Sequence, residues 1–136
     1  MITIDGKNAV LGRLASHIAQ RLLKGEEIML VNAEKVIITG NKKQIKEKYL
    51  ARRKKGSPQH GPFFPSRPDM IVKRAVRGML PYKTNKGRDA LRRLRVYVSL
   101  PGEIKGEMQT VAAKEISSNF LYVEDLAKTL GWKRQV

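Results

Sequence analysis

The chain of 136 residues contains no cysteine, which excludes disulfides, thiolate zinc sites and cysteine nucleophiles together. Histidine is nearly as scarce, because His17 and His60 are the only two and they are far apart. Neither is accompanied by acids at metal-ligand spacing. The sequence therefore predicts no metal site and no cofactor.

Long apolar runs are also missing. None approaches the roughly 20 residues that a membrane-spanning helix requires. The first residues, 1–5, have the pattern of a strand and not that of a signal peptide. We therefore expect a soluble, cytoplasmic protein that has no membrane partner.

Acidic residues are few, at 12 against 28 Lys and Arg, so the net charge is +16 and the pI is near 10.4. Self-repulsion of this size lowers stability unless a polyanion neutralises it. An anionic membrane surface is the competing polyanion, but the sequence lacks a basic amphipathic helix with exposed bulky apolar residues and any lipidation motif. Nucleic acid is the favoured partner.

The N-terminal part has the pattern of a β-α-β unit. Residues 2–5 alternate as a strand, and from Leu11 to about Lys24 the apolar residues recur at helical spacing, followed by Gly25 as a cap. The runs 28–31 and 36–39 are continuously apolar, as in a parallel sheet covered by helices. Residues 32–35 are too few for a crossover, which leaves open whether the two runs pair.

A strongly basic helix is expected from Lys42 to about Lys55, with Asn41 as its N-cap. A proline-rich loop over residues 56–68 follows and excludes regular structure. Within it, Phe63 and Phe64 either stack on bases or pin the loop to the core.

Further helices are predicted in the second half. Ser66 and Asp69 have capping-box spacing before a helix that ends at Gly78 and Pro81, and Asn85 is expected to cap a short one. The apolar residues expected to anchor this region to the core are Ile71, Val72, Ala75, Met79, Ala90, Leu91 and Leu94. A strand over 95–100, an exposed connection over 101–109 and a helix over 123–130, closed by Gly131, complete the chain.

Catalytic patterns are absent. The acid pairs 26–27 and 124–125 lie near helix ends and need no acid–base role. Residues 40–43 lack the upstream glycine and the Lys-Ser/Thr pair of a phosphate loop. We therefore predict no enzyme activity and no small-molecule substrate.

What remains is a set of cations on helices and loops that can neutralise phosphates. The predicted RNA-binding residues are Arg13, Lys42, Lys43, Arg52, Arg53, Lys54, Lys55, His60, Arg67, Arg74, Arg77, Lys83, Lys86, Gly87, Arg88, Arg92 and Arg93.

Several blocks resemble the universal large-subunit ribosomal protein number thirteen family. One block is Arg-Gly-Met-Leu-Pro at 77–81, followed by Gly87-Arg88 and by Leu-Arg-Val-Tyr at 94–97. The blocks at 11–16 and 31–42 agree in the same order, and Gly61-Pro62 and the ending from Phe120 to Lys133 are similar to the archaeal and eukaryotic branch. One departure is Val98-Ser99, where many relatives have a glycine.

The resemblance implies an α/β fold, three layers of α/β/α around a small, mostly parallel four-stranded sheet. It also implies binding to large-subunit rRNA early in assembly, beside neighbouring ribosomal proteins. It supports RNA contact at Arg77, Lys83, Lys86, Gly87 and Arg88, which lie in the matching motif.

We expect one domain over 1–136, with the irregular loop at 56–68 and a C-terminal helical extension at about 110–136. The predicted function is that of a structural constituent of the large ribosomal subunit. Two alternatives are an RNA-modifying enzyme and a free RNA-binding translational regulator.

Overall fold

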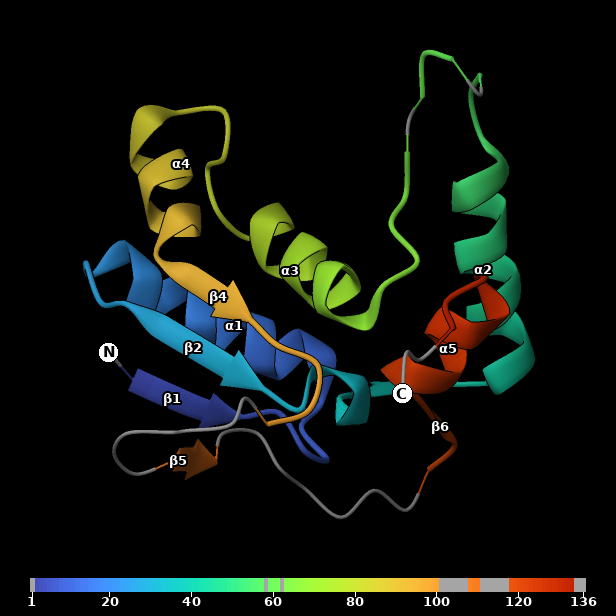
Figure 1. Ribbon diagram of the computed structural model, residues 1–136, viewed down its shortest axis with the longest axis horizontal. Coiled ribbons are helices and arrows are strands. Elements are labelled where there is room, and N and C mark those ends of the chain that lie inside the picture. Colours follow the sequence, from blue (N-terminus) through green and yellow to red (C-terminus); the bar gives the residue numbers. More distant parts are fainter. Residues whose placement is uncertain (1, 58, 62, 101–107, 111–117, 134–136) are drawn as a thin grey trace.

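A parallel four-stranded sheet forms the centre of the molecule (Figure 1). The computed structural model describes residues 2–57, 59–61, 63–100, 108–110 and 118–133. The strands β1 (Ile2–Asp5), β2 (Ile28–Val31), β4 (Leu94–Val96) and β5 (Met108–Thr110) lie in the order β4-β2-β1-β5, and every pairing is parallel. The predicted α/β fold class is confirmed.

The β-α-β unit at the start of the chain is also confirmed. Helix α1 (Leu11–Leu23) connects β1 to β2, which pair in register with Ile2 opposite Ile28. Six apolar residues of α1 are buried, all on one face, at positions 11, 14, 15, 18, 19 and 22. After the helix, Gly25 adopts a φ of +94°, a conformation that costs glycine little.

A second, smaller sheet shows how the two apolar runs, 28–31 and 36–39, are related. Strand β3 (Ile37–Thr39) does not pair with β2. A 3-10 turn, η1 (Ala33–Lys35), leads it away, and it pairs antiparallel with β6 (Phe120–Tyr122). Neither β5 nor β6 was predicted. Residues 108–109 of the expected exposed connection belong to β5, and 101–107 lie outside the described residues.

Four more helices complete the described structure: α2 (Lys42–Lys54), α3 (Pro68–Gly78), α4 (Asn85–Arg92) and α5 (Val123–Thr129). Helix α1 packs against α3 and α4, and α5 packs against α3 and η1. Leu126, Ala127 and Leu130 of the C-terminal part therefore join the same core as Leu14 and Leu30. The remainder of the predicted 110–136 extension, at 111–117 and 134–136, lies outside the described residues.

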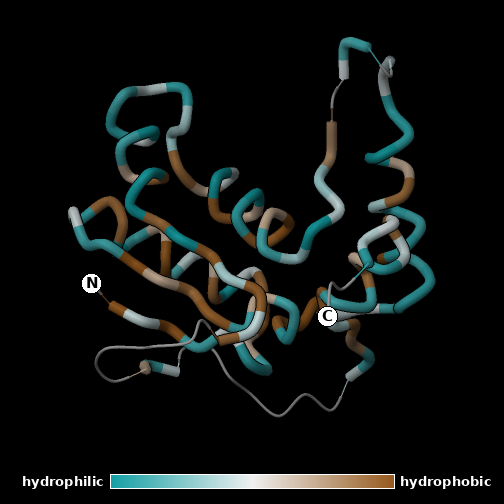
Figure 2. The backbone as a smooth tube through the Cα atoms, viewed as in Figure 1, coloured by the Kyte–Doolittle hydropathy of each residue, from teal (hydrophilic) through white to brown (hydrophobic). Residues whose placement is uncertain are grey.

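The hydrophobic residues follow this packing (Figure 2). They concentrate along the sheet and on the inward faces of α1 and α3, whereas α2 and α4 are mainly hydrophilic. Helix α2 buries only Ile45 among its residues. Among the described residues, no helix has the length and apolar character needed to cross a membrane.

Two predicted helix caps are wrong. Arg67 occupies the N-cap of α3 without a side-chain cap bond, Pro68 starts the helix, and Asp69 pairs with Arg67 at 3.1 Å and not with Ser66. Pro68 has no backbone N–H, so this helix start has one donor fewer to satisfy. Before α4, the N-cap is Thr84, whose hydroxyl accepts a hydrogen bond from the Gly87 N–H. Asn85 is the first residue of the helix and not its cap.

The prediction that Met79 anchors the 76–97 region to the core is also wrong. The Met79 side chain is 45% exposed, whereas its neighbours Val76 and Leu80 are buried. The chain leaves helical geometry at the end of α3, so the 3.6-residue period no longer applies there. Leu94 is buried as expected, and Leu91 is half-buried.

The predicted strand at 95–100 is shorter and shifted, since β4 covers only Leu94–Val96. The chain turns at Ser99, whose φ is +62°. Buried Glu34 holds this turn, because its carboxylate accepts hydrogen bonds from the Ser99 backbone N–H at 2.8 Å and from the Ser99 hydroxyl at 3.2 Å. Ser99, near which many relatives have a glycine, thus adopts a backbone conformation that glycine favours. Buried Glu34 stabilises this conformation.

We expect Glu34→Gln to lower the free energy of unfolding by about 1.5–3 kcal/mol, because hydrogen bonds to a charged group contribute about that much. Urea denaturation followed by circular dichroism measures the change. The matched control is Glu27→Gln at an exposed position, which should stay within about 0.5 kcal/mol of wild type. Equal effects of the two substitutions would show that Glu34 does not stabilise the turn.

Candidate nucleic-acid interface

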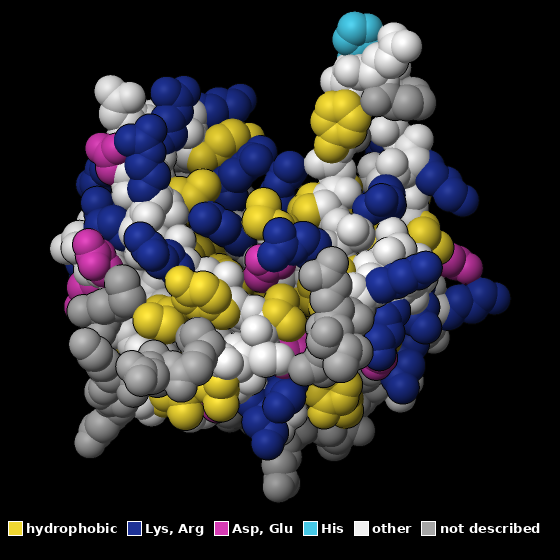
Figure 3. Space-filling model, in the orientation of Figure 1, with side chains coloured by type: hydrophobic (Ala, Val, Ile, Leu, Met, Phe, Trp, Pro, Cys, Tyr) yellow, Lys and Arg dark blue, Asp and Glu magenta, His cyan; other side chains and the backbone are white. Residues whose placement is uncertain are grey.

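A hollow opens on one side of the molecule, with α3 as its floor (Figure 3). Helix α4 forms one wall, and the loop between α2 and α3 forms the other (Figure 1). Lys and Arg side chains cover the α4 wall and the floor, and hydrophobic side chains are exposed on the floor and on the loop wall. We call this surface, formed by α3, α4 and the loop between α2 and α3, the basic hollow.

The floor of the basic hollow carries Lys73, Arg74 and Arg77. The spacings i,i+3 and i,i+4 place Arg74 and Lys73 on the same side of α3 as Arg77. All three are half-buried and line a cavity of about 180 Å³ together with Met70 and Leu91. The cavity thus combines a cationic side with an apolar side.

Each of these cations is positioned by a neighbouring group. Lys73 donates from Nζ to the Leu94 carbonyl at 3.4 Å, and Arg74 donates from Nη2 to the Phe63 carbonyl at 3.2 Å. The Arg77 guanidinium lies over the Tyr82 ring, with Cζ 4.6 Å from the ring centroid. None of the three forms an ion pair with a carboxylate of the described residues.

The turn from Pro81 to Gly87 presents further cations at the edge of α4. Lys83, Lys86 and Arg88 are exposed, but Gly87 is buried. A Cβ added at Gly87 would collide with the Pro81 carbonyl and would lie 2.8 Å from the Tyr82 nitrogen. The predicted importance of Gly87 therefore has a packing reason: only a residue without a side chain allows this turn to close.

The turn is closed by Thr84. Its hydroxyl donates to the Pro81 carbonyl at 2.7 Å and accepts from the Gly87 N–H at 3.3 Å. These bonds hold the start of α4 beside the end of α3. The same turn carries Tyr82, whose ring lies under Arg77.

The loop wall is braced from α2 through Phe64. The Phe64 ring meets Tyr49 edge to face with centroids 5.5 Å apart, and Arg53 donates to the Phe64 carbonyl at 3.4 Å. Burial raises the pKa of Tyr49, although the positive charge of Arg52 acts in the opposite direction. The phenol therefore stays neutral at physiological pH.

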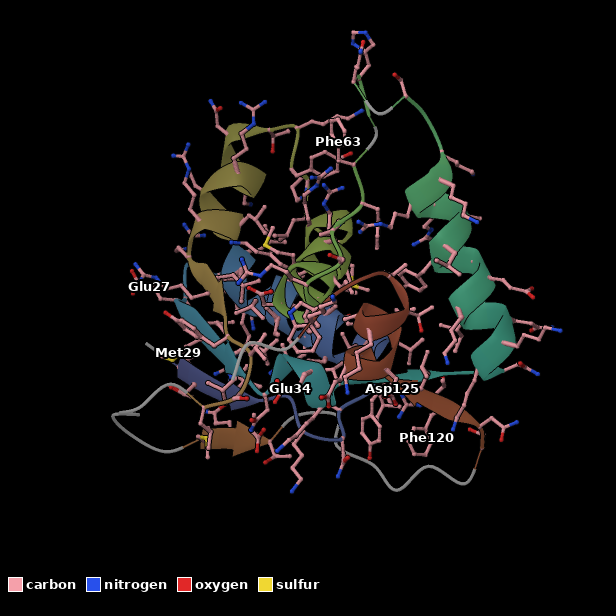
Figure 4. The ribbon with its side chains drawn as sticks, turned by 45° about the vertical axis from the view of Figure 1, so that its right-hand side comes forward. Glu27, Met29, Glu34, Phe63, Phe120 and Asp125 are labelled. Carbon is pink, nitrogen blue, oxygen red and sulfur yellow. The ribbon has the colours of Figure 1, made fainter. Side chains whose placement is uncertain are left out.

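The two phenylalanines have different environments, and the alternative in which the loop is pinned to the core holds for Phe64 alone. Phe64 packs against the core, whereas Phe63 is 63% exposed. Figure 4 shows Phe63 on the side of the loop that faces α4. Phe63 also lines a second cavity, of about 440 Å³, beside Arg53, Lys54 and Lys55.

Several of the remaining predicted residues lie in three separate places. Arg52, Arg53, Lys54 and Lys55 share the C-terminal end of α2 with the loop, which carries exposed His60. Lys42 and Lys43 are exposed at the other end of α2, about 15 Å away at 1.5 Å per residue. Arg13 is exposed on α1 and lines neither cavity.

Three predicted arginines are engaged within the protein. Arg93 is half-buried and donates to the Leu22 carbonyl at 2.6 Å, where it satisfies the end of α1. Arg67 pairs with Asp69, and Arg92 lies 3.7 Å from Asp89 on the exposed face of α4. The contact made by Arg93 gives it a structural role.

Four residues of the basic hollow were not predicted: Met70, Lys73, Tyr82 and Leu91. Lys73 could have been found, because it lies four residues before Arg77 on the same helix. The others had no comparable signal, since the meeting of α3, α4 and the 82–84 turn depends on tertiary packing. The described residues contain no cluster of three or more potential metal-binding side chains.

Residues 1–103 match the family described as Ribosomal protein L13. The chain belongs to this ribosomal protein family. It is 49% identical to the large ribosomal subunit protein uL13 of Methanopyrus kandleri, over 96% of this chain and 86% of that protein. Its identity is 45% to the proteins of the same name from Methanosarcina barkeri and Methanocaldococcus jannaschii, over 98% of this chain and 99% of each of them. The family predicted from the motifs, in its archaeal form, is confirmed.

Membership in this family excludes the enzyme alternative, because ribosomal protein L13 is a non-enzymatic structural protein. The basic hollow contains residues of the motifs on which the resemblance rested, including Arg77 and the turn before Gly87.

We expect Gly87→Ala to lower the free energy of unfolding by about 1–3 kcal/mol, the usual cost of overpacking. It should also weaken RNA binding, because the turn that presents Lys83 and Lys86 cannot close. Lys86→Ala is the neighbouring control and should change stability by less than about 0.5 kcal/mol. Thermal unfolding and RNA binding of both variants measure these effects. Equal losses of stability in Gly87→Ala and Lys86→Ala would contradict the packing argument.

Proposed function

We propose that this protein is a structural constituent of the large ribosomal subunit that binds large-subunit rRNA through the basic hollow. The observation that carries this proposal is the set of half-buried cations Lys73, Arg74 and Arg77, which have no carboxylate partner among the described residues. The family and its relatives, which are named as large-subunit proteins, support the same location.

The charge balance requires an external anion. Among the described residues, the ion pairs engage only Arg21, Arg67, Arg92 and Lys128 as cations. The chain has a net charge of +16, so most of its cations depend on solvent or on a polyanion. Phosphates of rRNA neutralise such cations with release of counterions, which is the main source of affinity in protein–nucleic acid binding.

The mode of binding follows from the shape of the surface. The basic hollow is concave and is built on α3, α4 and a braced loop, and its floor cations Lys73, Arg74 and Arg77 are held in place by neighbouring groups. Phosphate contacts of this kind position a protein on RNA without reading base pairs in the grooves. The contacts assigned to rRNA phosphates are Arg53, Lys54, Lys55, Lys73, Arg74, Lys83, Lys86 and Arg88.

Binding early in assembly requires that the protein recognise rRNA before its protein neighbours are present. The partners in this proposal are rRNA first and neighbouring large-subunit proteins later, in the cytoplasmic ribosome. No cofactor or small molecule takes part. A free translational regulator is the remaining alternative, and it predicts that the protein is absent from purified large subunits when their proteins are measured by mass spectrometry.

Affinity for deproteinised large-subunit rRNA should fall by orders of magnitude between 50 and 200 mM salt, as expected for roughly 6–10 phosphate contacts. Lys83→Ala and Arg88→Ala should each reduce the slope of log affinity against log salt by about 1. Filter binding over a salt series measures this. The control is Lys7→Ala, an exposed cation outside the basic hollow. A salt-independent affinity, or equal slopes for all three variants and wild type, would refute phosphate binding at the α4 edge.

Substitutions at Phe63 and at Phe64 should have different effects, the first on RNA binding and the second on folding stability. Phe63→Ala should weaken rRNA binding by roughly fivefold or more, since an aromatic–base stack contributes about 1–3 kcal/mol, with little change in stability. Phe64→Ala should lower the free energy of unfolding by about 2 kcal/mol, less than the about 3–5 kcal/mol of a fully buried phenylalanine. Filter binding and urea denaturation measure the pair. Unchanged binding by Phe63→Ala would remove the loop tip from the interface.

A further inference from the structure

The cavity between α3 and α4 has a composition that phosphate binding alone does not explain. It measures about 180 Å³ and is lined by Lys73, Arg74 and Arg77 on one side and by Met70 and Leu91 on the other. Met70 is 40% exposed beside these cations. A phosphate group would be neutralised by the cations but would leave the apolar side of the cavity in contact with a charged, hydrated group.

The Arg77 side chain is held as a flat surface. Its guanidinium lies over the Tyr82 ring, with Cζ 4.6 Å from the ring centroid, and the backbone of Tyr82 belongs to the turn that Thr84 and Gly87 close. A guanidinium supported on one face by an aromatic ring has its other face available for stacking, and bases of RNA stack on Arg planes as they do on aromatic rings. Such a support reduces the rotamer entropy lost on binding.

The size of the cavity restricts the ligand. Pockets for drug-sized ligands and cofactors measure about 300–1,000 Å³, so this one accommodates a single heterocycle and not a whole nucleotide or a helix. The cations beside it suit the phosphates on either side of that heterocycle. An acidic side chain of a protein partner would match the charge but not the apolar half.

We propose that the α3–α4 cavity binds one unpaired base of RNA, stacked on the Tyr82-supported Arg77 and flanked by Met70 and Leu91. Lys73 and Arg74 then hold the adjacent phosphates. This site rests on the proposed rRNA-binding function and adds to it an extruded nucleotide as a recognition element. It assigns Arg77 to a base, whereas Lys83 and Arg88 contact phosphates.

The test uses two variants of the full chain that preserve its charge, Arg77→Lys and Tyr82→Leu, with in vitro transcribed large-subunit rRNA as the probe. Both should weaken binding roughly 5- to 150-fold, the range for one stacked base, with an unchanged salt slope. The control is Arg95→Lys, an exposed position on β4 outside the cavity, which should stay within about twofold of wild type. Circular dichroism melts confirm that each variant is folded, and ultraviolet crosslinking should attach a single nucleotide within residues 70–91 of the wild type.

The outcomes separate this inference from the function on which it rests. If the wild type does not bind rRNA, both fail. If the wild type binds with a steep salt dependence but Arg77→Lys and Tyr82→Leu behave as Arg95→Lys does, the base site alone is wrong. If rRNA affinity is unchanged but the two variants are incorporated poorly into large subunits, the cavity holds a protein side chain and the base site is again wrong.

Discussion

Repulsion between like charges is the constraint on which this structure depends. The chain places 28 basic residues on a scaffold with 12 acidic ones, and the ion pairs of the described residues are few and mostly exposed. The apolar core must therefore stabilise the fold against its own surface. The structure divides these tasks in space: the sheet, α1 and α5 supply the core, while α2, α4 and the long loop carry charge with little burial.

The elements that were predicted correctly are those whose local pattern agrees with their tertiary environment. Helix α1 and strands β1 and β2 have continuous or periodic apolar residues that are buried in the structure. Strands β5 and β6 were missed because three residues give no detectable period, and their pairing with β1 and β3 depends on partners about 80–105 positions away in the chain. The Asn85 cap failed because Thr84 caps α4, and the Ser66 cap failed because α3 begins at Pro68 with Arg67 at its N-cap.

The candidate site was predictable in its charge but not in its geometry. Counting cations identified Arg74, Arg77 and the Lys83–Arg88 turn, because each is visible in the sequence. It could not distinguish Arg93, which satisfies the end of α1, from Arg88, which is exposed. Met70, Leu91 and Tyr82 became part of the site only because α3 and α4 both pack on α1, which no local pattern encodes.

The antiparallel pair β3–β6 also bears on the order in which the chain can fold. Synthesis proceeds from the N-terminus, so Val36 and Ile37 leave the ribosome long before their partners: Tyr122 pairs with Ile37, and the Val123 N–H donates to the Val36 carbonyl. Until α5 emerges, the apolar side chains that contact Leu126 and Leu130 remain in water. The final core is therefore completed only after nearly the whole chain has been made.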